Sequence, residues 1–173
     1  MIVDVQREFI KFINQNLLNN IKNYIEENKW ANIVVLVDEN KETCTIPEWM
    51  SNSSTKIVHK KYTTTKDESI YNDIELGEAE KVDDGFIYDD GKVVVDTDNA
   101  HDNFVIPKEL QEISKLLTDV VLIGGAAGEC LEDVEEALKY LKVKVEINKT
   151  FTYSAKDKYE DTSWSVIEKW VSV

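Results

Sequence analysis

The chain has 173 residues, which is enough to bury one hydrophobic core and too few for two comfortable domains. Its formal net charge of −14, with 20 basic residues interspersed among 34 acidic ones, argues against a nucleic-acid-binding protein, because phosphate binding requires clustered Lys and Arg. No apolar run approaches the ~20 residues that span a bilayer, and the first residues read as a strand instead of a signal peptide. We therefore expect a single cytoplasmic domain with no nucleic-acid or membrane partner.

The first part of the chain is typical of a strand, a helix and a second strand. Residues 1–5 are short and β-rich, and Asp4 lies at their carboxyl end. Residues 33–37 are continuously apolar, as in a strand covered on both faces. Between these strands, apolar residues recur at the spacing of one helix face: Leu17, Leu18, Ile21, Tyr24 and Ile25.

The middle of the chain predicts an insertion or lid around residues 63–105. It follows a further short strand at residues 56–62 and begins with a polar, acidic stretch. Residues 86–88 and 93–95 then flank Asp90 and Gly91, a pair that favours the positive φ of a tight turn, so they predict a β-hairpin.

The last part alternates again between helix and strand. Pro107 starts a helix, residues 120–123 form a buried strand, a helix begins near Leu131, and residues 143–147 alternate as a strand nearer an edge. A final helix carries Trp164, Ile167 and Val171. Alternation of this kind predicts a three-layer α/β/α fold with a mostly parallel, Rossmann-like sheet, plus the hairpin insertion.

Cys130 is the residue best placed for chemistry. It follows the run Gly-Gly-Ala-Ala-Gly at residues 124–128 and stands at a helix start, where unpaired amides and the helix dipole stabilise a thiolate. Ligands bind beyond the carboxyl ends of parallel strands, so Asp4 and Cys130 are expected to face one crevice. The alternative is a tight strand-to-helix connection with a packed cysteine. Cys44 is expected to be an ordinary buried free thiol.

Two segments resemble the isochorismatase-like cysteine hydrolases. Residues 2–6, Ile-Val-Asp-Val-Gln, with Phe9 are similar to the opening of that family, where an aspartate ends the first strand. Residues 121–124 with Ala126, Cys130 and Ala137 resemble its fourth strand and nucleophile helix. The resemblance covers most of the chain except about residues 40–105.

The resemblance implies a site as well as a fold. Cys130 is the implied nucleophile and Asp4 its partner, and the backbone amides of Ala126 and Cys130 form the implied oxyanion hole, with a cis peptide bond before Ala126. The chain departs from the family at Ala127 and Gly128, where the family usually has Thr-Asp or similar, so side chains that brace the loop are missing.

The family's third catalytic residue is a lysine that closes the third strand. Lys60 is the best match here and Lys61 is the near alternative. The customary spacing back from Cys130 instead leads to Thr97 or Asp98, where no lysine exists. Either the hairpin is inserted after the lysine, or the triad is broken.

The resulting hypothesis is an amidase-type cysteine hydrolase that acts on a small carboxamide or related carbonyl metabolite without a cofactor or metal. A metal is not expected, because the chain has only two histidines, and Asp98, His101 and Asp102 read as a polar loop. The alternative is a noncatalytic binding or interaction protein with a degenerate triad. The resemblance also implies homo-oligomers. Aromatic side chains that could line a pocket or the core are Trp49, Phe151 and Tyr153.

Overall fold

The computed structural model describes residues 1–28, 32–38, 44–52, 54–62, 73–83, 85–95, 104–156 and 170–173. Its helices are η1 (Arg7–Phe12), α1 (Gln15–Glu27), η2 (Glu48–Met50), α3 (Lys108–Ser114) and α4 (Cys130–Tyr140). Its strands are β1 (Ile2–Val3), β2 (Ile33–Asp38), β3 (Thr45–Pro47), β4 (Thr55–Tyr62), β5 (Ala79–Val82), β6 (Gly85–Tyr88), β7 (Val93–Val95), β8 (Phe104–Ile106), β9 (Asp119–Gly124), β10 (Lys144–Thr152) and β11 (Trp170–Ser172).

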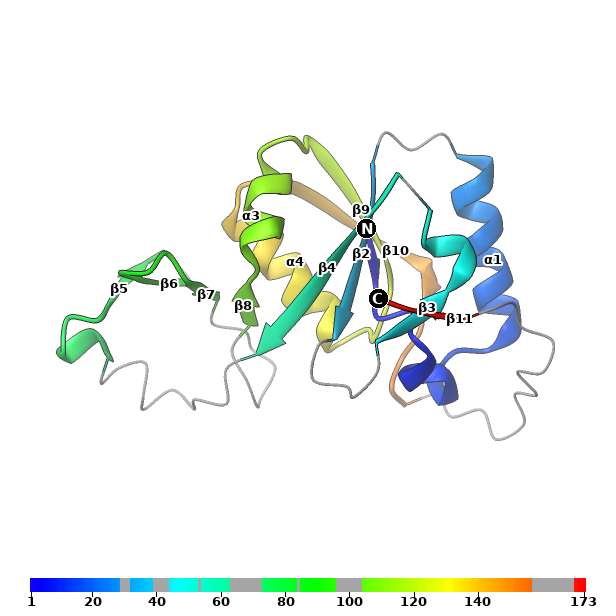
Figure 1. Cartoon of the computed structure of the whole chain (residues 1–173), viewed down its shortest axis with the longest axis horizontal. Helices are drawn as coiled ribbons and strands as arrows, with labels where there is room; N and C mark the ends of the chain where they lie inside the picture. The colour runs from blue at the N-terminus through cyan, green and yellow to red at the C-terminus, as the bar shows by residue number, and fades with distance from the viewer. Residues whose placement is uncertain are drawn as a thin grey trace.

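Most strands belong to one nine-stranded mixed sheet in the order β10-β9-β1-β2-β4-β8-β7-β6-β5 (Figure 1). The strands from β10 to β4 pair in parallel, whereas every pairing from β4 to β5 is antiparallel. A separate two-stranded sheet, β11-β3, is also antiparallel. Five of the nine pairings in the described part of the chain are thus antiparallel, and the predicted three-layer fold with a mostly parallel, Rossmann-like sheet is wrong.

The reversal of strand direction begins where β8 meets β4. Lys61 pairs with Val105 and Tyr62 with Phe104, so β8 runs back along the end of β4. The strands β5, β6 and β7 are only three or four residues long. These three strands also follow one another along the chain after only a few connecting residues. Strands joined by short connections pair antiparallel, because a parallel crossover requires a dozen or more residues. The hairpin expected around Asp90 and Gly91 is confirmed as β6 paired with β7.

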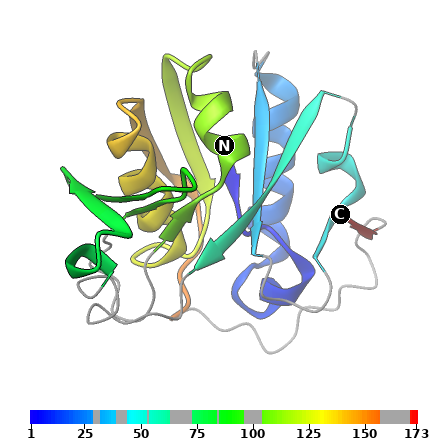
Figure 2. The same cartoon turned by 60° about the vertical axis from the view of Figure 1, so that its left-hand side comes forward.

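Two hydrophobic clusters lie on opposite faces of β2, which is why its sequence is continuously apolar. Val34 and Leu36 belong to the cluster that packs on α3 and α4, whereas Val35 and Val37 belong to the cluster that packs on α1 and η2. Figure 2 shows α1 behind β2 and β4, which run side by side in the same direction. The core therefore lies on both faces of β2, between the helices that cover them.

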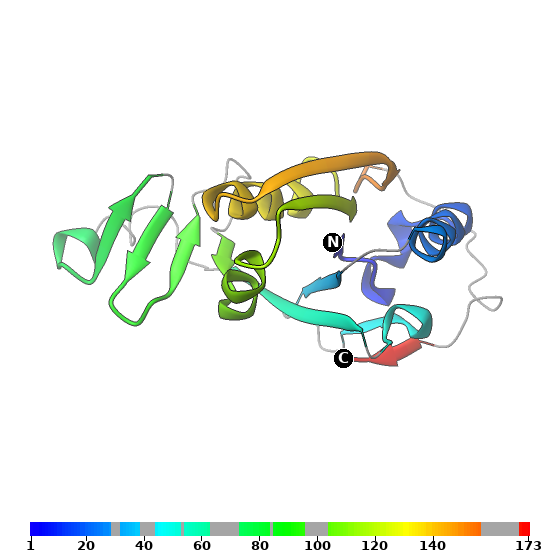
Figure 3. The same ribbon diagram turned by 90° about the horizontal axis from the view of Figure 1, so that it is seen from above.

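The strands β5, β6 and β7 lie to one side of the molecule, away from α1 (Figure 3). They have a small hydrophobic cluster of their own, in which Phe86 and Val94 are buried. These strands fall within the predicted insertion at residues 63–105, and its role as a lid stays a prediction.

The carboxyl-terminal residues differ from the expected helix. Trp164 and Ile167 lie outside the described residues, but Val171 belongs to β11, which pairs antiparallel with β3 through Val171 and Ile46. The helix prediction is wrong for this segment, because Val171 lies in an extended strand that pairs antiparallel with β3. In the part of the chain that the structure describes, no helix has the length and apolar character needed to cross a membrane.

A leucine pair tests the packing of β9, the strand that leads to Cys130. Leu122 is fully buried in the cluster under α4, whereas Leu116 is 72% exposed. We expect Leu122→Ala to lower the free energy of unfolding by about 2–5 kcal/mol and Leu116→Ala to change it by less than about 0.5 kcal/mol. Urea unfolding followed by circular dichroism measures both, and equal losses would contradict this account of the core.

Candidate active site

The carboxyl ends of parallel strands meet at one edge of the sheet. Asp4 directly follows β1, Lys60 lies near the end of β4, and Cys130 follows β9 across a short loop. Because β1, β2, β4 and β9 run in the same direction, these side chains lie at the same edge. The structure therefore brings together the three residues that the sequence placed in one crevice.

Asp4 and Lys60 form a buried ion pair. The Lys60 ammonium Nζ lies 2.5 Å from Oδ2 of Asp4, and both residues are fully buried. The backbone of Asp4 is also held, since its amide donates to the Leu36 carbonyl at 3.0 Å and its carbonyl accepts from the Tyr153 hydroxyl at 2.8 Å. The other carboxylate oxygen, Oδ1, is buried and accepts no hydrogen bond from the described residues. It is thus available to take a proton.

The alternation of β4 decides between the two lysines. Lys60 is buried and faces Asp4, whereas Lys61 is exposed and lies on the opposite face of the strand. Successive side chains of a strand point to opposite faces, so only one of the two can reach the crevice. Lys60 is the lysine beside Asp4.

Burial and charge shift the pKa of both partners. Burial raises the pKa of the Asp4 carboxyl above its usual value, and the charge of Lys60 offsets this rise only in part. Burial by itself lowers the pKa of Lys60, but the negative charges of Asp4 and of a Cys130 thiolate outweigh it and hold that pKa above its usual value. Lys60 therefore remains a cation, and Asp4 is a stronger base than an exposed aspartate.

Cys130 is half-buried at the first residue of α4, beside the ion pair. Asp4, Tyr62 and Lys60 all lie close enough to the Cys130 thiol to shift its pKa. Burial raises the pKa of the thiol to about 11, Lys60 lowers it and Asp4 raises it. The resting thiol is protonated at neutral pH, so a nucleophilic thiolate requires transfer of this proton to Asp4.

The loop before Cys130 is built on small residues. Gly124 has φ +102°, and a Cβ at this position would overlap the carbonyl oxygen of Val3. A cis peptide bond joins Gly125 to Ala126, where the resemblance implies one. The neighbouring amides of Ala127 and Leu131 donate to backbone carbonyls, whereas those of Ala126 and Cys130 donate to no described residue. These two amides can therefore bind an oxyanion.

Tyr153 braces this loop. Its carbonyl accepts from the Ala127 amide at 2.8 Å and its amide donates to the Gly124 carbonyl at 2.9 Å. Its buried ring lies against Gly125, where a Cβ would stand 2.6 Å from a ring carbon. Tyr153 thus supplies support that the small residues Ala127 and Gly128 do not give with their own side chains.

Two further polar side chains lie at the site; the sequence indicated Asp133 only as an acidic neighbour that raises the thiol pKa, and Tyr62 was not assigned to the site. The Tyr62 hydroxyl lies 3.3 Å from Nζ of Lys60 and donates to Oδ2 of Asp133 at 3.1 Å. Tyr62 shares a face of β4 with Lys60, and Asp133 follows Cys130 by one helical turn. These spacings could have placed Tyr62 near Lys60 and Asp133 near Cys130. No sequence pattern, however, predicts a hydrogen bond between Tyr62 and Asp133, which are 71 positions apart.

Other expected features fall elsewhere. Gln6 is buried, and its side-chain oxygen accepts from the Asp38 amide at 2.8 Å. Cys44 is a half-buried free thiol that donates to the Asp38 carbonyl. Phe151 stacks on Tyr24 with ring centroids 4.2 Å apart, which is a packing contact. Positions outside the described residues include Thr97, Asp98, His101 and Asp102.

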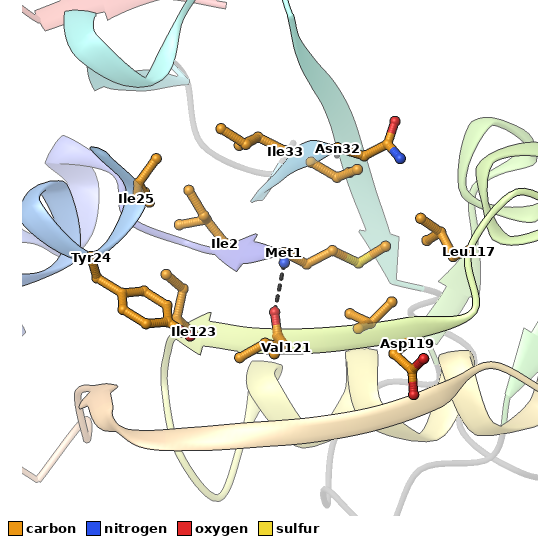
Figure 4. A pocket seen from close by; sticks show the side chains of 12 residues that line it. Met1, Ile2, Tyr24, Ile25, Asn32, Ile33, Leu117, Asp119, Val121 and Ile123 are labelled. Atoms are coloured by element: carbon orange, nitrogen blue, oxygen red, sulfur yellow. Dashed lines mark hydrogen bonds between the residues drawn. The ribbon is translucent and has the colours of Figure 1, made fainter. Parts of the chain in front are cut away.

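A separate pocket opens at the opposite end of the strands (Figure 4). Met1, Ile33 and Asp119, at the starts of three strands, contribute to its lining together with Tyr24 and Leu117. The Met1 nitrogen donates to the Val121 carbonyl at 2.6 Å. The lining contains no cysteine, serine, histidine or lysine side chain, so this pocket does not replace the edge with Cys130 as the place for thiol chemistry.

Comparison with models of known protein families, with curated proteins and with solved structures gives no match for this chain.

Substitutions of the neighbouring residues Lys60 and Lys61 test whether the Lys60 charge lowers the pKa of the Cys130 thiol. We expect Lys60→Met to slow alkylation of Cys130 by iodoacetamide at pH 8 about tenfold, because loss of the cation raises the thiol pKa and leaves less thiolate. Peptide mass mapping separates Cys130 from Cys44. Unfolding exposes the thiol and speeds its alkylation, so a slower reaction cannot arise from a misfolded variant. Lys61→Met is the matched control and should stay within twofold of wild type; equal effects of both changes would refute the assignment.

Proposed function

We propose that this protein is a cysteine hydrolase of the amidase type that acts on a small carboxamide or related carbonyl metabolite. The observation that carries the proposal is the meeting of three side chains at one edge of the sheet: the Asp4–Lys60 ion pair at 2.5 Å and the Cys130 thiol beside it, whose pKa both charges shift. A thiol, a base within hydrogen-bond reach and a fixed cation are the parts that covalent acyl transfer requires.

The reaction begins with proton transfer from Cys130 to Asp4. The sulfur then attacks the carbonyl carbon of the substrate, and the amides of Ala126 and Cys130 hold the negative oxygen of the tetrahedral intermediate. Asp4 returns the proton to the leaving nitrogen, the carbon–nitrogen bond breaks, and ammonia or an amine departs. The product of this half-reaction is a thioester on Cys130.

Water completes the cycle. Asp4, again ionised, takes a proton from water while the water oxygen attacks the thioester carbonyl. The carbon–sulfur bond breaks, the acid is released, and the proton returns to the sulfur. Lys60 keeps its charge throughout, since its pKa lies above the usual value for lysine. Neither half-reaction uses a cofactor or a metal.

The resemblance of residues 2–6 and 121–137 to isochorismatase-like cysteine hydrolases supports the same chemistry. The free thiols Cys44 and Cys130 fit a reducing compartment such as the cytoplasm. A noncatalytic binding protein is the second candidate, and the observation that favours it is the thiol pKa of about 11, which leaves little thiolate at rest.

Trapping an acyl-enzyme tests the proposal directly. We expect wild-type protein incubated with a panel of small carboxamides and activated esters to gain the mass of an acyl group at Cys130 and to release the acid. Cys130→Ala should lose at least about 10³ of the hydrolysis rate, because no other nucleophile attacks the carbonyl. An unmodified Cys130 and equal rates for both proteins would support the binding protein instead.

A substitution at Asp4 distinguishes its role as a general base from the effect of its negative charge on the thiol pKa. Asp4→Asn removes a group that raises the thiol pKa, so alkylation of Cys130 should become faster while hydrolysis falls by about 10²–10⁴, since the base is lost. Circular dichroism and alkylation in urea give the reference for unfolded protein. Hydrolysis that persists in Asp4→Asn would assign the base to another residue.

We retain homo-oligomer formation as a prediction from the family resemblance. Multi-angle light scattering of the full chain measures the molar mass, and we expect at least a dimer of the 19.9 kDa chain. A monomer across the accessible concentration range would contradict it.

A further inference from the structure

Tyr62 brings a fourth polar group to the sulfur of Cys130. The hydroxyl accepts a hydrogen bond from Nζ of Lys60 at 3.3 Å and lies close enough to Cys130 to lower the pKa of its thiol. It donates to Oδ2 of Asp133, which is 4% exposed, at 3.1 Å. The hydroxyl proton is thus held by the Asp133 carboxylate, and the Cys130 sulfur is the other acceptor in its surroundings.

The surroundings keep this hydroxyl protonated. Burial, followed by the negative charges of Cys130, Asp133 and Asp4, raises the pKa of Tyr62 far above its usual value. Three titratable groups lie beside the sulfur: Lys60 and Tyr62 from β4, and Asp4 from the end of β1. Asp133 on α4 accepts the hydrogen bond of Tyr62. The charges of Asp38 and Glu129 raise the pKa of other groups around the site, Asp4 and Tyr153. Tyr62 is therefore a hydrogen-bond donor throughout the working pH range.

We propose that Tyr62 is a catalytic residue whose hydroxyl turns from Asp133 to the sulfur when Cys130 becomes a thiolate, and that Asp133 is a positioning residue that holds the hydroxyl while the thiol is protonated. The inference rests on the proposed function. The thiol proton passes to Asp4, the hydroxyl proton stays on Tyr62, and Lys60 donates to the hydroxyl oxygen in both states. A charge-assisted hydrogen bond to the thiolate then offsets part of the burial that disfavours it.

A purely structural role for Tyr62 has a different signature. Its ring meets the Phe104 ring edge-on, with centroids 5.5 Å apart and planes inclined at 65°. Phenylalanine retains this packing and removes only the hydroxyl. The variant Tyr62→Phe therefore leaves packing in place and deletes the donor, so the thiol itself reports the difference.

The decisive measurement is the rate of Cys130 alkylation by iodoacetamide from pH 7 to 11, read by peptide mass mapping. We expect Tyr62→Phe to shift the profile about one unit to higher pH, which is about a tenfold slower reaction at pH 8. Tyr88→Phe is the matched control, because the Tyr88 hydroxyl also donates to an aspartate, Asp73 at 2.9 Å. It should leave the profile unchanged. A Tyr62→Phe profile that superimposes on wild type would overturn the proposal.

Two changes at Asp133 test the positioning role. Asp133→Asn removes the charge and keeps an acceptor, whereas Asp133→Ala removes both and frees the hydroxyl for the sulfur. We expect Cys130 to react about threefold faster in Asp133→Ala than in Asp133→Asn, and equally fast in both once Tyr62→Phe is added. Equal rates in the presence of Tyr62 would overturn the role of Asp133. Unfolded protein, measured in urea, supplies the upper reference for all variants.

Alkylation requires no substrate, so this inference and the proposed function fail in different ways. If Tyr62→Phe shifts the profile while no amide is hydrolysed, the hydrogen bond to the thiolate is supported and the hydrolase is not. If wild type hydrolyses an amide and Tyr62→Phe retains both its kcat/KM and its alkylation profile, the hydrolase is supported and the role of Tyr62 is overturned.

Discussion

The buried Asp4–Lys60 ion pair is the constraint on which the site depends. Two charges removed from water are tolerated only when they compensate each other, and loss of one partner of such a pair typically costs about 3–5 kcal/mol. Asp4 follows β1 and Lys60 belongs to β4, and β2 lies between these strands in the sheet. The pair therefore requires the three strands to keep one register, and it locates the edge at which Cys130 meets them.

The same burial creates the chemical problem that the site must solve. It raises the pKa of the Cys130 thiol to about 11, far from what a preformed thiolate at neutral pH requires. It also raises the pKa of Asp4, and a carboxylate with a raised pKa is a better acceptor for the thiol proton. Lys60 keeps its charge between them. The arrangement favours proton transfer in the course of attack over a standing thiolate.

Local patterns indicate which side chains of one strand share a face, but they do not indicate how the strands pair. The alternation of β4 identifies Lys60 and Tyr62 as neighbours on one face, and the small residues before Cys130 indicate a close approach of backbone, which Gly124 requires. The direction in which β8 pairs with β4 is absent from any local pattern, because strands that run either way have the same period of two. The mostly parallel sheet was inferred from the alternation of helices and strands, and this inference is wrong from the antiparallel pairing of β8 with β4 onward.

Long-range contacts explain why the rest of the site escaped prediction. Tyr153 comes from the end of β10 and binds the backbone of Asp4, 149 residues earlier, as well as the glycine loop before Cys130. A tyrosine beyond the end of a predicted strand is normally assigned to the core, and no feature of its neighbours marks a hydrogen bond to so distant a carbonyl. Because β10 borders β9 in parallel, its end returns to the same edge of the sheet as β1. The loop thus takes its support from backbone hydrogen bonds to Tyr153, and side chains at Ala127 and Gly128 are not needed to hold it.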